Sequence, residues 1–284
     1  MLAAIAVAAA PAHADKPKSR PATTHVTETA PPPEPPLAPA SITLPQGTTK
    51  LDATVESEMS NNVVAKPVSI APDLAFGATD DLTLGIVTSK FATTGFRGSA
   101  GGGLCVGGND YGCPHVLNAG GLEGWYALTT GGIATAAGAG AFATDFDKGY
   151  YAFKLGVKTK WTAGRFVGTL SPSVFVAATK RTDYFGMAIN KDALYVPVTA
   201  GVKPTAAATI FVGSGVKGPL QGLATHWQVP FGVGATYAVG PEVTLGASWV
   251  FGALFSGADN PPPPKPPVDG PDLRVLQVWA SYTR

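Results

Sequence analysis

The stretch Tyr150–Thr162 reads YYAFKLGVKTKWT, and from Tyr151 onward its side chains alternate in steps of two. One face of such a strand carries mostly aromatic and aliphatic groups, namely Tyr151, Phe153, Leu155, Val157 and Trp161. The opposite face carries small and basic groups, namely Ala152, Lys154, Gly156, Lys158 and Lys160. A soluble β-sandwich would bury the apolar face in its core, whereas a membrane β-barrel would turn that face to lipid and the lysines to water. The rest of the chain distinguishes these two structures.

The composition of the chain favours the membrane barrel. Only 14% of the 284 residues are charged, against about 25% in an ordinary soluble domain. Beyond the first residues there is no apolar run of about 18 residues, so no transmembrane helix is predicted. The formal net charge is +1, and no basic patch with interleaved aromatic residues appears, which argues against nucleic acid as a partner.

Two segments precede the predicted β domain. Residues 1–14 hold an apolar run and end in the pattern Ala-His-Ala, which is typical of a secretory signal peptide cleaved after Ala14. Residues 15–46 are rich in Pro, Thr and Ala and are expected to form a stiff, disordered periplasmic spacer. Binding of this proline-rich arm to another envelope component is the alternative. Residues 47–284 are long enough for one large β domain.

The two cysteines lie close together in the sequence CVGGNDYGC. In an exported protein, Cys105 and Cys113 are expected to form a disulfide that staples a glycine-rich loop. His115 lies nearby, but two cysteines and one histidine in an exported loop make a poor zinc site. We therefore predict no metal site.

Segments with period-two alternation, bounded by Gly, Pro, Asn and Asp, recur along the rest of the chain. We predict strands at residues 49–59, 67–79, 82–89, 122–130, 133–146, 150–162, 166–179, 193–203, 207–217, 226–239, 243–255 and 273–284. Small residues leave the phase of the segment 133–146 ambiguous. The sequence thus predicts about twelve strands, with ten to fourteen as the range.

The connections between these segments differ in length. Short turns follow the even-numbered segments, while the connections after the third, seventh, ninth and eleventh segments are longer. Sorting of this kind is typical of outer-membrane barrels, which have tight periplasmic turns and longer extracellular loops. Four prolines inside the predicted strands indicate bulges, strand ends or an altered register: Pro72, Pro172, Pro197 and Pro230.

From residue 48 to the last residue, the chain resembles a bacterial outer-membrane β-barrel protein. The resemblance rests on the leader, the strand pattern, the sorted connections and a final segment that is a strand. It implies an all-β fold, a transmembrane antiparallel up-and-down barrel located in the outer membrane, with lipid and lipopolysaccharide as its surroundings. Aromatic residues near segment ends are candidates for the interfacial girdles of such a barrel: Tyr150, Tyr151, Trp161, Trp227, Tyr237, Trp249 and Tyr282.

Charged residues in the inward phase are the candidate functional groups. By alternation, the candidate lumen charges are Asp52, Glu56, Glu58, Asp73, Glu123, Lys154, Lys158, Lys160 and Lys203. In an open pore these charges would set the field that acts on small polar solutes. If they instead pair with one another, the barrel is a closed structural or adhesive one. A secreted, soluble all-β binding domain is the third alternative.

No catalytic motif appears in the sequence. A Ser-His arrangement oriented by an acidic group or Asn would be needed for an outer-membrane phospholipase. His226 begins a predicted strand and has no serine-rich motif beside it. A nucleophile elbow, a zinc-protease motif and a phosphate-binding loop are also missing from the sequence. We therefore expect no enzymatic activity and no cofactor.

Overall fold

A computed structural model describes residues 41–59, 68–89, 104–107, 117, 119–179, 190, 192–257 and 274–284. The predicted signal peptide, most of the proline-rich segment and Cys113 lie outside these residues. Cys105 is described and is not a free thiol. Its pairing with Cys113 stays a prediction. Among the described residues, no helix is long and apolar enough to cross a membrane.

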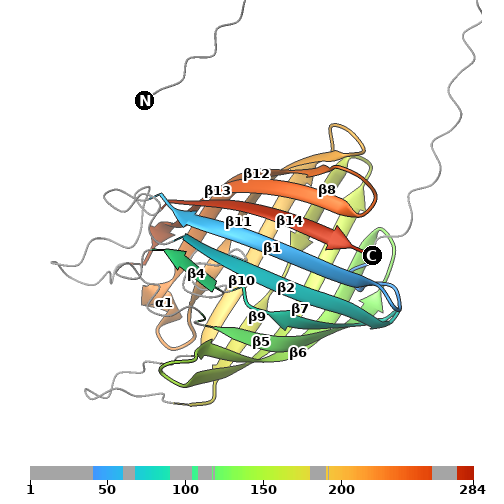
Figure 1. Ribbon diagram of the computed structural model, residues 1–284. Helices are drawn as coiled ribbons and strands as arrows, with labels where there is room; N and C mark the ends of the chain where they lie inside the picture. The colour runs from blue at the N-terminus through green and yellow to red at the C-terminus, as the bar shows by residue number, and fades with distance from the viewer. Residues whose placement is uncertain are drawn as a thin grey trace, which may run out of the picture. The chain divides into compact units, whose positions relative to one another are not determined.

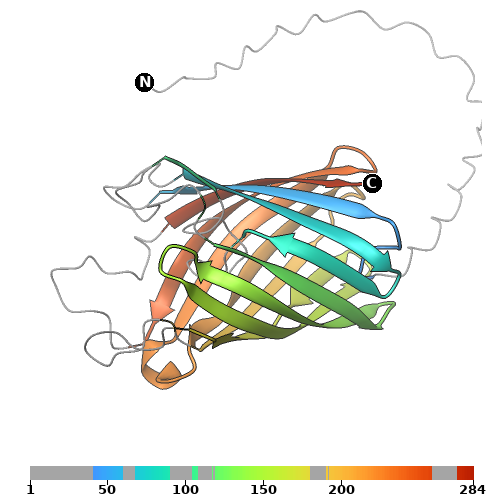
Figure 2. The ribbon, with the colours of Figure 1, turned by 60° about the horizontal axis from the view of Figure 1, so that its bottom comes forward.

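The described chain is an antiparallel β-barrel (Figures 1 and 2). Its strands are β1 (Thr49–Glu58), β2 (Val68–Thr79), β3 (Leu82–Val87), β4 (Leu104–Gly107), β5 (Gly120–Thr129), β6 (Ile133–Asp145), β7 (Tyr150–Ala163), β8 (Phe166–Leu170), β9 (Ser173–Ala177), β10 (Ala193–Val202), β11 (Ala208–Pro219), β12 (Gln228–Ala238), β13 (Val243–Ser256) and β14 (Arg274–Thr283). The short helix α1 spans Leu223–His226.

The barrel has twelve strand positions, as predicted. Apart from β4 and β9, each strand pairs with the strands before and after it in the ring, and β1 closes the ring by pairing with both β2 and β14. The strands β8 and β9 share one position, because both pair with β7 and with β10. The strand β4 stands outside the ring and pairs with the start of β2.

The two ends of the barrel differ, as the connection lengths predicted. Tight turns at residues 80–81, 130–132, 164–165, 203–207 and 239–242 share one end, which we call the turn end. The connections at the opposite, loop end include the long segments 88–119, 178–192 and 257–273. The chain terminus at Arg284 lies at the turn end (Figure 1).

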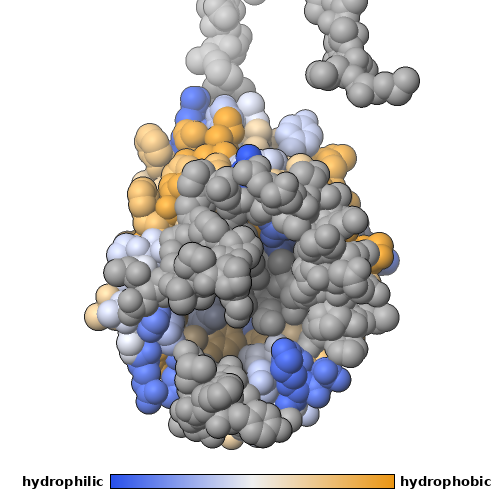
Figure 3. Space-filling model, turned by 90° about the vertical axis from the view of Figure 1, so that its left-hand side faces the viewer, coloured by the Kyte–Doolittle hydropathy of each residue, from blue (hydrophilic) through white to orange (hydrophobic). Residues whose placement is uncertain are grey.

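The apolar face of the sheet lies on the outside of the barrel. Phe153 and Leu155 of β7 are 58% and 60% exposed, and exposed large apolar side chains occur on almost every strand of the ring. Figure 3, which looks onto the loop end, shows apolar side chains on the outer surface. A sandwich would have buried these groups, so the soluble-sandwich interpretation is wrong and the outer surface is one that lipid would cover.

Three of the four prolines mark irregular strand pairing, as predicted. Pro172 lies in the break between β8 and β9, and the Ser171 amide at this break donates to the Pro197 carbonyl of β10. Pro230 lies where the register of β12 against β13 shifts. Pro72 differs, because β2 continues through it and keeps its register with β1. The sheet thus tolerates a missing donor by breaking or bulging locally.

Tertiary contacts begin earlier in the chain than the sequence predicts. Residues 41–46 belong to the predicted spacer, but in the structure they pack against the turn between β2 and β3. The buried Thr43 hydroxyl donates to the Asp80 carbonyl at 2.8 Å, and the Leu44 amide donates to the Thr83 hydroxyl at 2.8 Å. Gly77 permits the approach, because a Cβ there would collide with the Pro45 backbone. These contacts join residues that are distant in the sequence, so the composition of the segment itself does not predict them.

Candidate functional site

The candidate site is the barrel interior, whose wall has two unlike halves. Side chains from β3, β5, β6, β7, β9 and β10 pack tightly on one half, which we call the packed wall. Side chains from β11 to β14 and from β1 surround a cavity on the other half, which we call the hollow wall. The inward positions of the hollow wall include Gly213 and Gly232 next to the larger Phe211 and Trp279.

A buried ion pair lies at the centre of the packed wall. The Lys154 Nζ is 2.7 Å from the Glu123 Oε2, and the two side chains are only 2% and 5% exposed. The Lys158 Nζ lies 3.8 Å from the other oxygen of the same carboxylate. A charge buried to this degree needs its partner, so this pair is part of the structure of the wall.

Aromatic rings surround the Lys154 ammonium. The Nζ lies 5.0 Å from the ring centre of Trp125, 5.6 Å from that of Phe142 and 5.9 Å from that of Phe175. Lys158 also stands over Trp125, at 3.7 Å. Phe175 makes edge-to-face contacts with Phe142 and with Tyr195 of β10. Cation–π attraction and ring packing therefore hold this half of the interior closed.

Acidic groups lie on β1 and β2, next to the hollow wall. Gln277 of β14 donates to the Glu56 Oε2 at 2.6 Å, and Ser248 of β13 donates to the Gln277 Oε1 at 3.1 Å. Lys217 of β11 is buried and interacts electrostatically with Glu56. Glu58, the last residue of β1, shares the inward phase of Glu56.

Asp73 has a structural role at the end of β3. Its carboxylate accepts hydrogen bonds from the backbone amides of Thr88 and Ser89 at 2.7 and 2.9 Å, and from the Ser89 hydroxyl at 2.6 Å. Asp73 is also the direct cross-strand neighbour of Asp52. These bonds cap the backbone of β3 where its ladder stops.

Lysines gather at the turn end of the interior. Lys160 of β7 shares the phase of Lys154, and the charges of Lys203 and Lys50 act on it. Lys203 follows β10 and donates its backbone amide to the Arg165 carbonyl at 2.8 Å. The Lys50 Nζ is 2.8 Å from Asp52, which also accepts from the Ser281 hydroxyl. Basic charge is therefore concentrated at this mouth.

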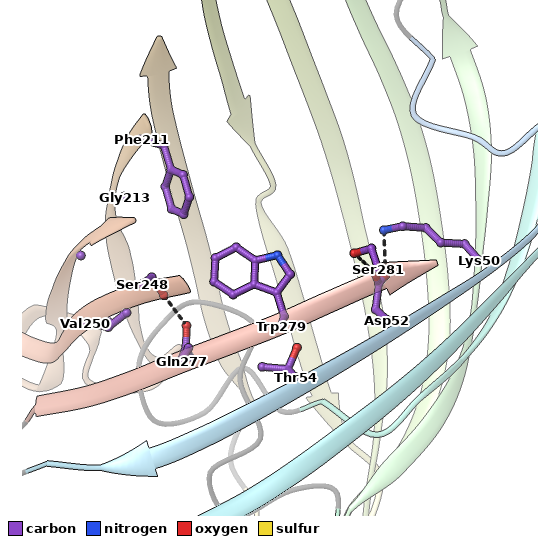
Figure 4. Close-up of a pocket in the computed structure, with 11 residues that line it drawn as sticks. Lys50, Asp52, Thr54, Phe211, Gly213, Ser248, Val250, Gln277, Trp279 and Ser281 are labelled. Atoms are coloured by element: carbon purple, nitrogen blue, oxygen red, sulfur yellow. Dashed lines mark hydrogen bonds and ion pairs between the residues drawn. The ribbon is translucent and has the colours of Figure 1, made fainter. Parts of the chain in front are cut away.

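The hollow wall encloses a cavity of about 320 Å³ (Figure 4). Polar and apolar groups share its surface: Lys50, Asp52, Thr54, Phe211, Gly213, Gly232, Ser248, Val250, Gln277, Trp279 and Ser281. Within the described residues, no cluster of His, Cys, Asp and Glu could hold a metal ion.

The predicted girdle residues occupy several positions. Tyr151 and Trp227 lie at the loop end, and Trp161, Tyr237 and Tyr282 lie near the turn end. Tyr150 shares the inward phase of Lys154, and Trp249 lies at the middle of β13. These last two positions do not fit a lipid-facing band, because a girdle needs aromatic groups on the outer surface at its edges.

Sequence reasoning missed several interior residues, most of them uncharged. It did not single out Trp125, Trp279, Phe211, Tyr195, Gln277, Lys50 or Lys217. The phase of each strand would have placed Trp125 and Trp279 inside, since each alternates with exposed apolar residues. A large aromatic group in a phase otherwise filled by small and polar residues was the available signal.

Solved structures of bacterial porins superpose on this barrel. The NanC porin superposes with a TM-score of 0.56 at 10% sequence identity, covering 82% of this chain and 98% of the porin. The KdgM porin in complex with disordered oligogalacturonate gives a TM-score of 0.51 at 6% identity, over the same shares of the two chains. No protein-family model and no curated protein match the chain. The chain therefore has the porin fold of the bacterial outer membrane, and its apolar outer surface suits that location.

Proposed function

We propose that this barrel is a passive channel for small polar solutes. The observation that carries the proposal is the unequal interior, in which one wall is packed and the other surrounds a cavity lined by glycine, hydroxyl, amide and charged groups. Solutes would cross along the hollow wall. The porin fold of the structural relatives supports this function, although their own solutes say nothing about the solute of this chain.

The charges of the interior would act on a solute as it crosses. Lys160 and Lys203 place positive charge at the turn end, while Lys50 compensates Asp52 and Lys217 acts on Glu56 along β1. Lys154 and Glu123 compensate each other, so they contribute little to the field. The positive charge at the turn end would therefore set the ion preference.

A closed structural barrel is the second candidate. The packed wall favours it, since aromatic rings and a buried ion pair fill that half of the interior. The two candidates differ in conductance, because a closed barrel would insert into a bilayer without passing ions. In either case, outer-membrane lipid would cover the outer surface, and lipopolysaccharide would surround its loop end.

The substitution Lys160→Glu tests the channel. It reverses one charge at the turn end without removing a partner from a buried pair. Two units of charge at roughly 10 Å in water change the energy of a passing ion by about 0.8 kcal/mol, with opposite sign for a cation and an anion, which is about fourfold for each ion and about sixteenfold for their ratio. We therefore expect the ratio of cation to anion permeability of single channels in planar bilayers to rise by up to about sixteenfold, as measured by the reversal potential in a salt gradient.

Arg165→Glu is the matched control. Arg165 is exposed in the turn between β7 and β8, at the same mouth but outside the interior. The same reversal of charge there is expected to change the selectivity much less. Equal shifts in the two variants, or insertion without conductance, would contradict the proposed channel.

A further inference from the structure

The hollow wall carries two aromatic side chains next to each other. The ring centres of Phe211 and Trp279 are 6.2 Å apart, and the ring planes are tilted by 50°. Trp279 lies across the neighbouring strand over Gly246, where a Cβ would collide with the indole. The glycine therefore fixes the indole against the wall, so that one aromatic face is presented to the cavity.

Polar groups lie on both sides of Trp279 (Figure 4). Lys50, Asp52 and Ser281 form a hydrogen-bonded group on one side. Ser248 and Gln277 form a second group on the other side. The cavity thus offers ammonium, carboxylate, amide and hydroxyl groups around an apolar surface.

We propose that this cavity binds a neutral sugar unit during its passage. The inference rests on the proposed channel function and names its solute class. A sugar ring has an apolar C–H face that would stack on the Trp279 indole, and its hydroxyls can both donate and accept hydrogen bonds, which suits a lining of donors and acceptors. The cavity volume of about 320 Å³ suits one or two such rings.

The charges of the cavity favour a neutral sugar over an acidic one. Lys50 and Asp52 form an ion pair at 2.8 Å, and Lys217 acts on the charge of Glu56, so these charges compensate one another. An acidic sugar would give up its hydration here without a matching gain, so it would be bound more weakly than a neutral one.

Binding can be measured without transport. The refolded full chain, in a detergent without a sugar head group, is titrated with maltotriose and with trigalacturonate by calorimetry. We expect maltotriose to bind more tightly. Trp279→Ala should weaken maltotriose binding at least about tenfold, as expected when an aromatic stacking contact of about 1.4 kcal/mol is lost. Phe211→Ala should also weaken it.

Trp161→Ala is the matched control. Trp161 also lies over a cross-strand glycine, Gly168, but in the outward phase of β7. Its removal should leave the affinity unchanged. Heat-modifiable migration on gels verifies that each variant is folded.

Conductance of the same preparations separates this inference from the proposed function. Conductance without maltotriose binding would overturn the sugar site and leave the channel in place. Maltotriose binding that needs Trp279, without conductance, would support the site and overturn the channel. Preference for trigalacturonate, or equal loss in the Trp279 and Trp161 variants, would also overturn the sugar site.

Discussion

Replacing Lys154 with methionine is expected to lower the free energy of unfolding by about 3 kcal/mol. Removing one partner of a buried ion pair costs about 3–5 kcal/mol, because the remaining charge is left in a region of low polarity. The lower end applies here, since Lys158 stays 3.8 Å from Glu123. Loss of the cation among three aromatic rings adds to the effect. Denaturant unfolding in lipid vesicles, followed by tryptophan fluorescence, measures the change.

Two variants control this prediction. Lys158→Met removes a lysine that is 27% exposed and is expected to cost less than about 1 kcal/mol. The double variant Lys154→Met/Glu123→Leu removes both buried charges and should recover most of the stability lost by the single one. A Lys154→Met variant with the same free energy of unfolding as the wild type would contradict a buried ion pair in the packed wall.

Replacing Leu155 with arginine tests the lipid-facing surface. Leu155 lies near the middle of β7 and is 60% exposed. On a surface exposed to water, an added arginine would hardly change the free energy of unfolding. At the bilayer midplane, an arginine lowers it by about 2–4 kcal/mol. We expect a loss of that size in vesicle unfolding experiments.

A position at a different depth in the membrane provides the control. Tyr151 lies on the same face of the same strand but next to the loop end. Tyr151→Arg should cost only about 0–1 kcal/mol, since charge is tolerated near the interface. Similar costs at the two positions would contradict the orientation of the barrel in the membrane.

The strands and their phase were predictable because both depend on local alternation. Leu155 and Lys154 fall on opposite faces whatever the rest of the chain does. In the segment 133–146 local alternation was not enough, since glycine and alanine suit either face. The register with β5 and β7 settles the phase and buries Ala134, Ala136 and Phe142.

The contacts of the interior were not predictable, because they join distant parts of the chain. Gln277 and Glu56 are separated by 221 residues and meet only when β14 closes the ring on β1. The strand pattern placed Lys154, Lys158 and Lys160 on one face, as candidate lumen charges. The structure divides them, since Lys154 is buried with Glu123 while Lys160 lies among lysines at the turn end.

The most direct test of the central claim is thiol modification at the hollow wall during conductance. Thr54→Cys, in a chain with Cys105→Ser and Cys113→Ser, places a thiol of similar size among the residues that line the cavity. Val55→Cys places a thiol on the outer face, one residue away. We predict that a charged, water-soluble methanethiosulfonate causes a lasting stepwise fall in the conductance of the Thr54 variant and no change in the Val55 variant. If modification of the Thr54→Cys variant leaves its conductance unchanged, or if the protein does not conduct at all, passage along the hollow wall is contradicted.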